Sequence, residues 1–362
     1  MAVSENLAEA LNNVELEYEN GVITGVNDPY SYQKLTGMLS YLFGQQNTER
    51  SIIQTEMIRE ASNSKFRKLK LRYLPHDGEN NVSETVNVCN AVAMNREEIE
   101  IIEPTLEVQA KFSIDEDIIQ QGTLEDLQSR LTKEFANATR KLRERIDLNI
   151  FSAAATNAGT NPAKNAAAGT YTSLELLKAD GTVSSDVFDT IKNDHEDNFM
   201  VGDMGVVGLG NMRKYINRLA VGADNDGGVQ VGEIMSEFGQ MLYKDQQTNA
   251  ALGGANRVLA FTPGLQSFYN YSFYLGQDFR FNTTGFRATS TITDPVYPIV
   301  YDYVAKYDDG CGSGGSGKTG VWTFTVFTHY DLWTVNPDAF GDVYGDLAGF
   351  NGIVGYDITQ AS

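Results

Sequence analysis

The stretch that decides the fold is residues 123–155, TLEDLQSRLTKEFANATRKLRERIDLNIFSAAA. Its apolar residues recur at steps of three or four, so they line one face of an α-helix. These residues are Leu124, Leu127, Leu131, Phe135, Ala138, Leu142, Ile146 and Ile150. Thr123 is a favourable N-cap, and Asp126 stands where the reciprocal capping acid belongs. Neither Gly nor Pro interrupts the run, and the sequence therefore predicts one helix roughly 45–50 Å long.

A helix about three times the average length needs a long partner for its apolar face. A sheet or other helices would cover that face, and an ordinary bundle or coiled-coil helix is the alternative that periodicity leaves open. The remaining faces mix both signs of charge. Their charged residues are Arg130, Lys133, Arg140, Lys141, Arg143, Arg145, Glu125, Glu134, Glu144 and Asp147.

The composition is that of an acidic globular chain. Its 362 residues can hold one large domain or two to three subdomains. The net charge of −20 argues against a protein whose main task is to grip nucleic acid, because phosphate binding needs an excess of Lys and Arg. The acidic start MAVSENLAEALNN predicts no signal peptide, and no segment is apolar for long enough to predict a membrane span. Cys89 and Cys311 form neither a metal-ligand pair nor a disulfide framework, which favours synthesis in a reducing cytoplasm.

A basic β-hairpin is expected over residues 64–95. In KFRKLKLRYL the apolar and basic residues alternate at strand period, and PHDGENN is a turn-rich tip. Three interpretations stay open for the cations of the first strand: a nucleic-acid contact, a solvated strand face, or a basic arm that lies across an acidic neighbouring subunit. These cations are Lys65, Arg67, Lys68, Lys70 and Arg72.

The rest of the chain mixes helices and strands. Alternation predicts strands in 98–102 and 105–114, whereas 184–199 has the pattern of a capped amphipathic helix. A short buried strand and a second helix are expected within 202–220. Residues 229–340 are expected to be rich in strands, and the last segment is expected to be a Gly-rich tail.

Two glycine motifs resemble nucleotide-binding loops, but neither has the surrounding residues that such a loop requires. Residues 312–319, GSGGSGKT, match the phosphate-loop pattern, but that loop must lead into a helix and the residues that follow alternate like a strand. Gly208-Leu-Gly210-Asn-Met-Arg213 resembles a dinucleotide fingerprint, with Arg213 in place of the third glycine. Nucleotide binding is therefore disfavoured at both.

No other pattern points to catalysis or to a metal. His76, His195 and His329 have no partner at metal-ligand spacing, and ADNDGG is followed by Met235 where a calcium loop requires Glu. A spatial set such as Ser-His-Asp stays open, because its members need not be close in sequence. We expect no catalytic, cofactor-binding or metal-binding residues.

The order of segments is more informative than any motif. Residues 103–156 resemble the central stretch of tailed-bacteriophage major capsid proteins of the Hong Kong 97-like fold: a strand, a short acidic segment and a long spine helix that ends in small residues. The hairpin 64–95 stands where that family carries its extended E-loop. Residues 184–219 are similar to the opening of its axial domain, and 321–341 are similar to its closing strand.

The resemblance implies an α+β fold with a spine helix at 123–155, an E-loop β-hairpin, a peripheral (P) domain and an axial (A) domain. The implied division of the chain is an N-terminal arm 1–58, an E-loop 59–96, a peripheral domain 97–168, an axial domain 169–300, strands returning to the peripheral domain 301–340, and a C-terminal tail 341–362.

The resemblance also implies a function. The chain would be a non-enzymatic head protein that assembles with itself into hexamers and pentamers of an icosahedral shell around dsDNA. Scaffold, portal and head auxiliary proteins would be its other partners, with only weak, non-specific DNA contact, no cofactor and no membrane. It would be assembled in the host cytoplasm and reside in the virion. The predicted inter-subunit contacts are Lys65, Arg67, Lys68, Lys70, Arg72, Arg140, Arg143 and Arg145.

Two other classes remain as alternatives. The density of Tyr and Phe in residues 261–345 would suit an aromatic-rich β protein that binds carbohydrate or acts at a cell surface. A nucleotide-dependent enzyme is the third possibility.

Overall fold

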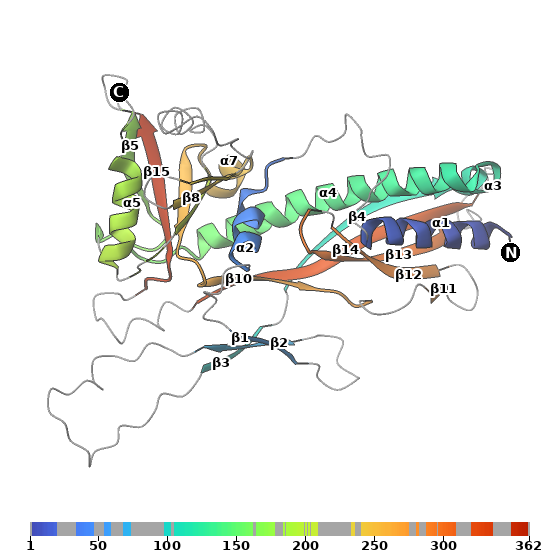
Figure 1. Cartoon of the computed structure of the whole chain (residues 1–362), viewed down its shortest axis with the longest axis horizontal. Helices are drawn as coiled ribbons and strands as arrows, with labels where there is room; N and C mark the ends of the chain where they lie inside the picture. The colour runs from blue at the N-terminus through green and yellow to red at the C-terminus, as the bar shows by residue number, and fades with distance from the viewer. Residues whose placement is uncertain are drawn as a thin grey trace, which may run out of the picture. The chain divides into compact units, whose positions relative to one another are not determined.

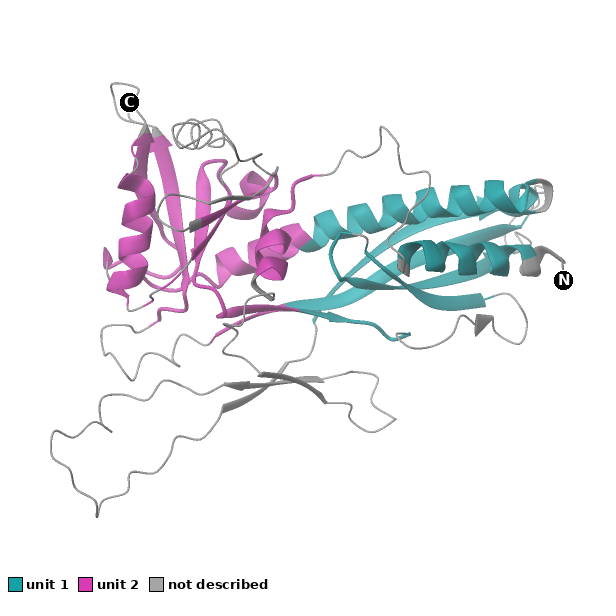
Figure 2. Ribbon diagram, viewed as in Figure 1, with its two compact units in different colours: residues 1–33, 104–146, 269–331 teal, residues 34–103, 147–268, 332–362 magenta. Residues whose placement is uncertain are grey.

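The computed structural model contains both helices and strands, which confirms the expected α+β composition. It describes residues 2–19, 34–46, 54–58, 68–73, 98–102, 105–161, 164–177, 184, 186–198, 200, 202, 204–208, 233–235, 240–274, 280–281, 287–294, 296–308, 320–335 and 349–360. Two compact units, each built from separate stretches of chain, divide the protein (Figure 2). Unit 1 comprises residues 1–33, 104–146 and 269–331, and unit 2 comprises 34–103, 147–268 and 332–362.

The predicted long helix is α4, Leu124–Thr156, with 33 residues. Seven of the eight apolar residues that define its predicted face are at most 6% exposed. At its start, the Thr123 hydroxyl donates to the Asp126 carboxylate at 2.8 Å and accepts from the Asp126 N–H at 3.2 Å. The helix and its cap are therefore confirmed.

The cap predicts a modest effect on stability. Thr123→Ala removes the acceptor for the Asp126 N–H, so we expect urea denaturation to show a loss of about 1 kcal/mol in the free energy of unfolding. Thr156→Ala, at the last residue of the same helix, is the matched control. A loss that is equal for the two variants would contradict the capping role.

Unit 1 is a sheet with helices packed on it. Its strands run in the order β10-β14-β13-β12-β11, and β4 also pairs with β14. Their bounds are β4 Leu106–Asp115, β10 Gln266–Tyr271, β11 Arg280–Phe281, β12 Arg287–Thr293, β13 Val300–Asp308 and β14 Val321–Thr334. The short helix α3, Glu116–Gln121, leads from β4 into α4.

The apolar face of α4 in unit 1 packs on this sheet, as Figure 1 lets the reader follow. Phe135 lies with its ring centroid 5.1 Å from Phe112 on β4, 5.1 Å from Tyr303 on β13 and 5.9 Å from Phe324 on β14. Burial alternates along β14 because every second side chain turns to this core. The partner of the long helix in this unit is therefore a sheet and not a coiled coil.

The N-terminal helix α1, Ala2–Glu19, also belongs to unit 1. Leu7, Leu11 and Val14 are at most 1% exposed. Glu17 accepts hydrogen bonds from the Gln128 amide at 2.8 Å and the Thr132 hydroxyl at 3.0 Å of α4. This part of the expected N-terminal arm thus packs on its own chain.

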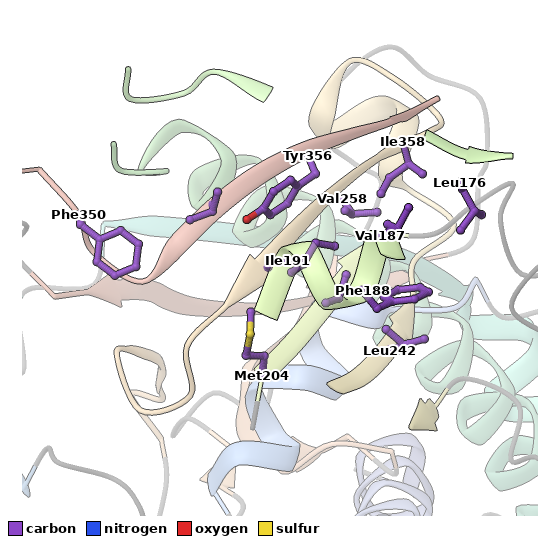
Figure 3. Close-up of a cluster of buried hydrophobic side chains, with 13 residues drawn as sticks. Leu176, Val187, Phe188, Ile191, Met204, Leu242, Val258, Phe350, Tyr356 and Ile358 are labelled. Carbon is purple, nitrogen blue, oxygen red and sulfur yellow. The ribbon is translucent and has the colours of Figure 1, made fainter. Parts of the chain in front are cut away.

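Unit 2 holds a mixed sheet in the order β5-β15-β9-β6-β8-β7. Its strands are β5 Tyr171–Leu177, β6 Met204–Gly208, β7 Glu233–Met235, β8 Gln240–Lys244, β9 Arg257–Phe261 and β15 Ile353–Gln360. Its other helices are α2 Gly37–Gln46, α5 Asp186–Asp197 and α7 Thr248–Leu252. Figure 3 shows the core, in which Val187, Phe188 and Ile191 of α5 meet side chains of the sheet.

The expected Gly-rich C-terminal tail is different in the structure. Residues 353–360 form β15, which pairs parallel with β5 and antiparallel with β9, so it lies inside the sheet. The glycines allow this burial: a Cβ on Gly355 would lie 2.9 Å from the Tyr171 ring. The expected division into peripheral and axial domains stays a prediction; the compact units of the structure group residues 269–300 with β13 in unit 1.

A separate three-stranded sheet contains the basic strand. β1 (Gln54–Ile58), β2 (Lys68–Tyr73) and β3 (Glu98–Ile102) pair antiparallel in that order. The expected return strand 82–94, the helix expected at 211–220 and the ADNDGG turn lie outside the described residues.

Candidate functional site: charged helix faces and buried ionic groups

The predicted inter-subunit cations fall on two elements. Lys68, Lys70 and Arg72 lie in β2, where the backbone register sets Lys70 opposite Glu56 of β1. The remaining two of the basic strand, Lys65 and Arg67, lie outside the described residues. Arg140, Arg143 and Arg145 lie in α4. Contact with another subunit stays a prediction for these residues, with Arg143 as the exception below.

Arg143 serves the interior of unit 1. Its guanidinium lies 2.8 Å from the Asp294 carboxylate, and the two side chains are 4% and 0% exposed. Asp294 also accepts hydrogen bonds from the Val296 N–H at 2.8 Å and the Tyr301 hydroxyl at 3.3 Å. Burial and the nearby Asp294 raise the pKa of Tyr301 well above its usual value, which keeps its proton in place to donate. A side chain held this way is not available to a neighbouring subunit, so the contact predicted for Arg143 is corrected.

Cations predominate on the exposed face of α4 between Arg130 and Arg145, whereas Glu125 and Asp126 are exposed in its first turn. Arg130, Lys133, Lys141 and Arg145 are exposed, and no hydrogen bond or ion pair joins their side chains to others in the part of the chain that the structure describes. Arg140 is half-buried and donates to Asn137 at 2.7 Å. This cationic face is a candidate surface for an anionic partner.

A buried acid pair holds the start of α2 in unit 2. Asp147 of α4 and Asp245, which follows β8, are both 0% exposed. Asp147 accepts from the Leu39 N–H at 2.9 Å, and Asp245 accepts from the Met38 N–H at 3.2 Å and the Gln247 N–H at 2.6 Å. The pair thus binds the free N–H groups of the first turn of α2, which otherwise would be buried without partners.

Burial favours a bound proton on this pair of carboxyl groups. Burial, and then the charge of Asp245, raise the pKa of Asp147 well above its usual value. Burial also raises the pKa of Asp245, whereas the hydrogen bond from Asp147 lowers it. Because the pKa of Asp147 is raised further, we assign the proton to Asp147 and the role of acceptor to Asp245. The apolar stripe in the sequence predicted Asp147 on a solvated face. That prediction was wrong because the buried face drifts around the helix and includes Phe151 and Ala154 near its end.

A second buried carboxylate lies at the end of α5. Asp194 is 1% exposed, lies 3.1 Å from the Lys164 ammonium, and accepts from the Tyr356 hydroxyl at 3.1 Å. The next residue, His195, is fully buried, and burial lowers its pKa to about 4, so it is neutral near pH 7. No motif in the sequence signals this cluster, which depends on partners far along the chain.

The aromatic residues that favoured carbohydrate binding are largely internal. Tyr301, Tyr303, Phe324 and Tyr330 are all 0% exposed. These four side chains belong to the core of unit 1, so packing explains their presence.

The phosphate-loop match is also resolved by the fold. Residues 309–319 connect β13 to β14, which pair antiparallel from Asp308 and Val321 onward. A strand, and not a helix, follows the glycines, as the sequence predicted. Among the described residues, no group of three or more His, Cys, Asp or Glu side chains is placed to hold a metal ion. None of the helices described is both long and apolar enough to span a bilayer.

Neither a family model nor a curated protein matches the chain. Solved structures do match it. The capsid asymmetric unit of cyanophage A-1(L) is 12% identical, with 92% of this chain and 95% of that chain covered and a TM-score of 0.48. The capsid structure of cyanophage P-SCSP1u is 9% identical, with coverage of 85% and 90% and a TM-score of 0.40. The capsid of an empty GTA particle is 14% identical, with coverage of 80% and 91% and a TM-score of 0.39. The three structures are capsids of two cyanophages and of a GTA particle.

Proposed function

We propose that this chain is the major capsid protein of a tailed bacteriophage. In this role it assembles with itself into hexamers and pentamers, and these form the icosahedral shell that encloses the dsDNA genome. The role is structural and not enzymatic. Scaffold, portal and head auxiliary proteins are its proposed partners, and the virion is its proposed location after assembly in the host cytoplasm.

One observation supports this proposal most strongly. β4 leads through the acidic α3 into the 33-residue α4, and the chain later returns to the same place through β14. β14 pairs with β4 along all ten residues from Leu106 to Asp115. The resemblance to capsid proteins required this strand, acidic segment, long helix and closing strand in this order.

Within the proposal, unit 1 with α4 corresponds to the peripheral domain and unit 2 to the axial domain. The three-stranded sheet of β1, β2 and β3 lies at the base of the proposed E-loop, residues 59–96. An arm of this kind adds contact area, and large buried areas characterise permanent assemblies. The net charge of −20 suits a wall to which packaged DNA adheres only weakly and non-specifically.

Assembly of the purified chain tests the proposal. We expect size-exclusion chromatography and negative-stain microscopy at high protein concentration to show rings of five or six, sheets or closed shells. Replacement of residues 64–95 by a short Gly-Ser linker should abolish these species. A variant that reverses Lys68, Lys70 and Arg72 to Glu keeps the length of the arm and should weaken assembly. A persistent monomer of 39.9 kDa at every concentration and salt level would count against the proposal.

A further inference from the structure

The basic face of α4 has a regular spacing. Arg130, Lys133, Lys141 and Arg145 are exposed and follow one another at helical intervals, with the half-buried Asn137 between them. At 1.5 Å per residue the face is about 22 Å long. Glu134, four residues after Arg130, and Glu144, three residues after Lys141, lie among these cations and are half-buried. The face therefore keeps an excess of positive charge in a chain whose net charge is −20.

The helix α5 of unit 2 presents the opposite charge with the same spacing. Its exposed residues are Asp186, Asp189, Asn193, Glu196 and Asp197. Its other face is fixed in the core of unit 2, where Figure 3 shows Val187, Phe188 and Ile191. The acidic face is exposed. Lys192 of the same helix lies with its ammonium 3.8 Å from the Glu196 carboxylate and offsets that charge. The acidic face is about 17 Å long.

We infer that the basic face of α4 in one copy of this chain docks against the acidic face of α5 in another copy. The inference rests on the proposed function, because it names a contact between subunits of the assembly. Both faces are polar helical ridges with charges three or four residues apart, which is the spacing at which helices pack ridges into grooves. Charge complementarity of this kind sets orientation and register between partners.

A second copy fits the basic face better than duplex DNA does. Duplex DNA carries one negative charge per about 1.7 Å of its axis. The rest of this chain, whose net charge is −20, repels that charge. A copy of this chain brings the same overall repulsion, yet it also presents a ridge of matching length and spacing. Like-charged subunits that assemble need such opposed patches, because their remaining surfaces repel one another.

The contact joins different surfaces of the two copies, so it is head-to-tail. Contacts of this type generate closed rings when the rotation closes. Two helical ridges of this length cover only part of the roughly 800 Å² per partner that a specific interface needs. The helix pair therefore sets the register of neighbours, while other surfaces supply most of the buried area.

Charge reversal tests the inference without changing the core. The first variant, K133E/K141E/R145E, makes the α4 face acidic. The second, D189K/E196K/D197K, makes the α5 face basic. Each variant alone opposes like charges, so we expect the protein concentration needed for assembly to rise by about a hundredfold or more. An equimolar mixture should form six-membered rings near the wild-type concentration, because alternation of the two variants sets each reversed face against its complement. A five-membered ring cannot alternate, so the mixture is scored on six-membered rings alone.

A third variant controls for net charge. K111E/R287E/K306E reverses three exposed cations on strands of unit 1, away from both faces, and changes the net charge as much as the first variant does. It should assemble like wild type, and circular dichroism should show that all variants are folded. Assembly of both single-face variants at the wild-type concentration would overturn the inference, as would a mixture that is not rescued.

DNA binding distinguishes the alternative occupant. If the first variant assembles normally but loses binding to a 30-base-pair duplex that wild type retains in fluorescence anisotropy, the face binds DNA and the inference is wrong. If wild type itself forms nothing larger than a monomer, the proposed function fails together with this contact. Normal wild-type assembly with unaffected variants overturns the contact alone.

Discussion

Replacement of Arg143 by Met should lower the free energy of unfolding by about 3–5 kcal/mol, because it leaves a buried carboxylate without its counter-charge. The Asp294 side chain is fully buried and lies 2.8 Å from the Arg143 guanidinium. Met has a similar length and remains helix-compatible, so the loss reports the ion pair and not the packing volume. Urea denaturation followed by circular dichroism measures the change.

The same helix provides a matched control. Arg145, two residues further on, is exposed, so Arg145→Met should change the free energy of unfolding by less than about 0.5 kcal/mol. The double variant R143M/D294N should recover part of the loss, because an amide costs less to bury than an unpaired carboxylate. Equal losses for Arg143→Met and Arg145→Met would show that the buried pair does not stabilise unit 1.

The second large effect concerns the buried acids at the start of α2, where two similar substitutions should differ. Asp147→Asn keeps a donor toward Asp245 and an acceptor for the Leu39 N–H, and it loses the 3.3 Å hydrogen bond from the Gln247 amide. We expect a change of about 1 kcal/mol near pH 7. The two oxygens of Asp245 accept hydrogen bonds from the backbone N–H groups of Met38 and Gln247. Asp245→Asn replaces one of these oxygens with an N–H₂ group, which cannot accept. We expect this substitution to cost about 2–4 kcal/mol.

The pH dependence of stability follows from the direction of the pKa shifts. Both carboxyl pKa values are raised in the folded chain, so the folded chain keeps a proton that the unfolded chain releases above about pH 4. The stabilisation is therefore complete below the unfolded pKa and declines as pH rises through the raised folded value. Asp147→Asn removes one titrating group, and its unfolding free energy should fall less between about pH 5 and 8 than that of wild type.

Unfolding midpoints of the three proteins across this pH range check both statements. Because the pair binds the first turn of α2, hydrogen exchange at Met38 and Leu39 should accelerate in Asp245→Asn and stay slow in Asp147→Asn. Greater damage from Asp147→Asn than from Asp245→Asn would reverse the assigned donor and acceptor.

Local patterns were sufficient for most elements of the fold. The steps of three and four that run from Leu127 to Ile150 require a helix, since only that period turns these side chains to one face. The alternation in β14 requires a strand in the same way. The resemblance in segment order indicated that the strand before the long helix and the closing strand belong to one domain. In the structure these strands are β4 and β14, which pair antiparallel.

Long-range pairing accounts for what those patterns missed. The glycines near the C-terminus suggested a tail, yet β15 is buried because β5 and β9, each far from it in sequence, supply its hydrogen bonds on both sides. Arg143 looked like a surface residue because its acid, Asp294, lies 151 positions away. Asp147 and Asp245 are likewise 98 residues apart in the sequence. No local pattern therefore indicates that together they cap α2.

By itself the sequence determined the long capped helix, the alternating strands, the acidic charge and the strand β14 that follows the glycines, because each depends on neighbours within a few residues. The tertiary structure alone decided which cations face solvent, which carboxylates are buried and where β15 inserts. These depend on segments that meet only in the folded chain, where burial changes the energy of a charge far more than its position in the sequence does.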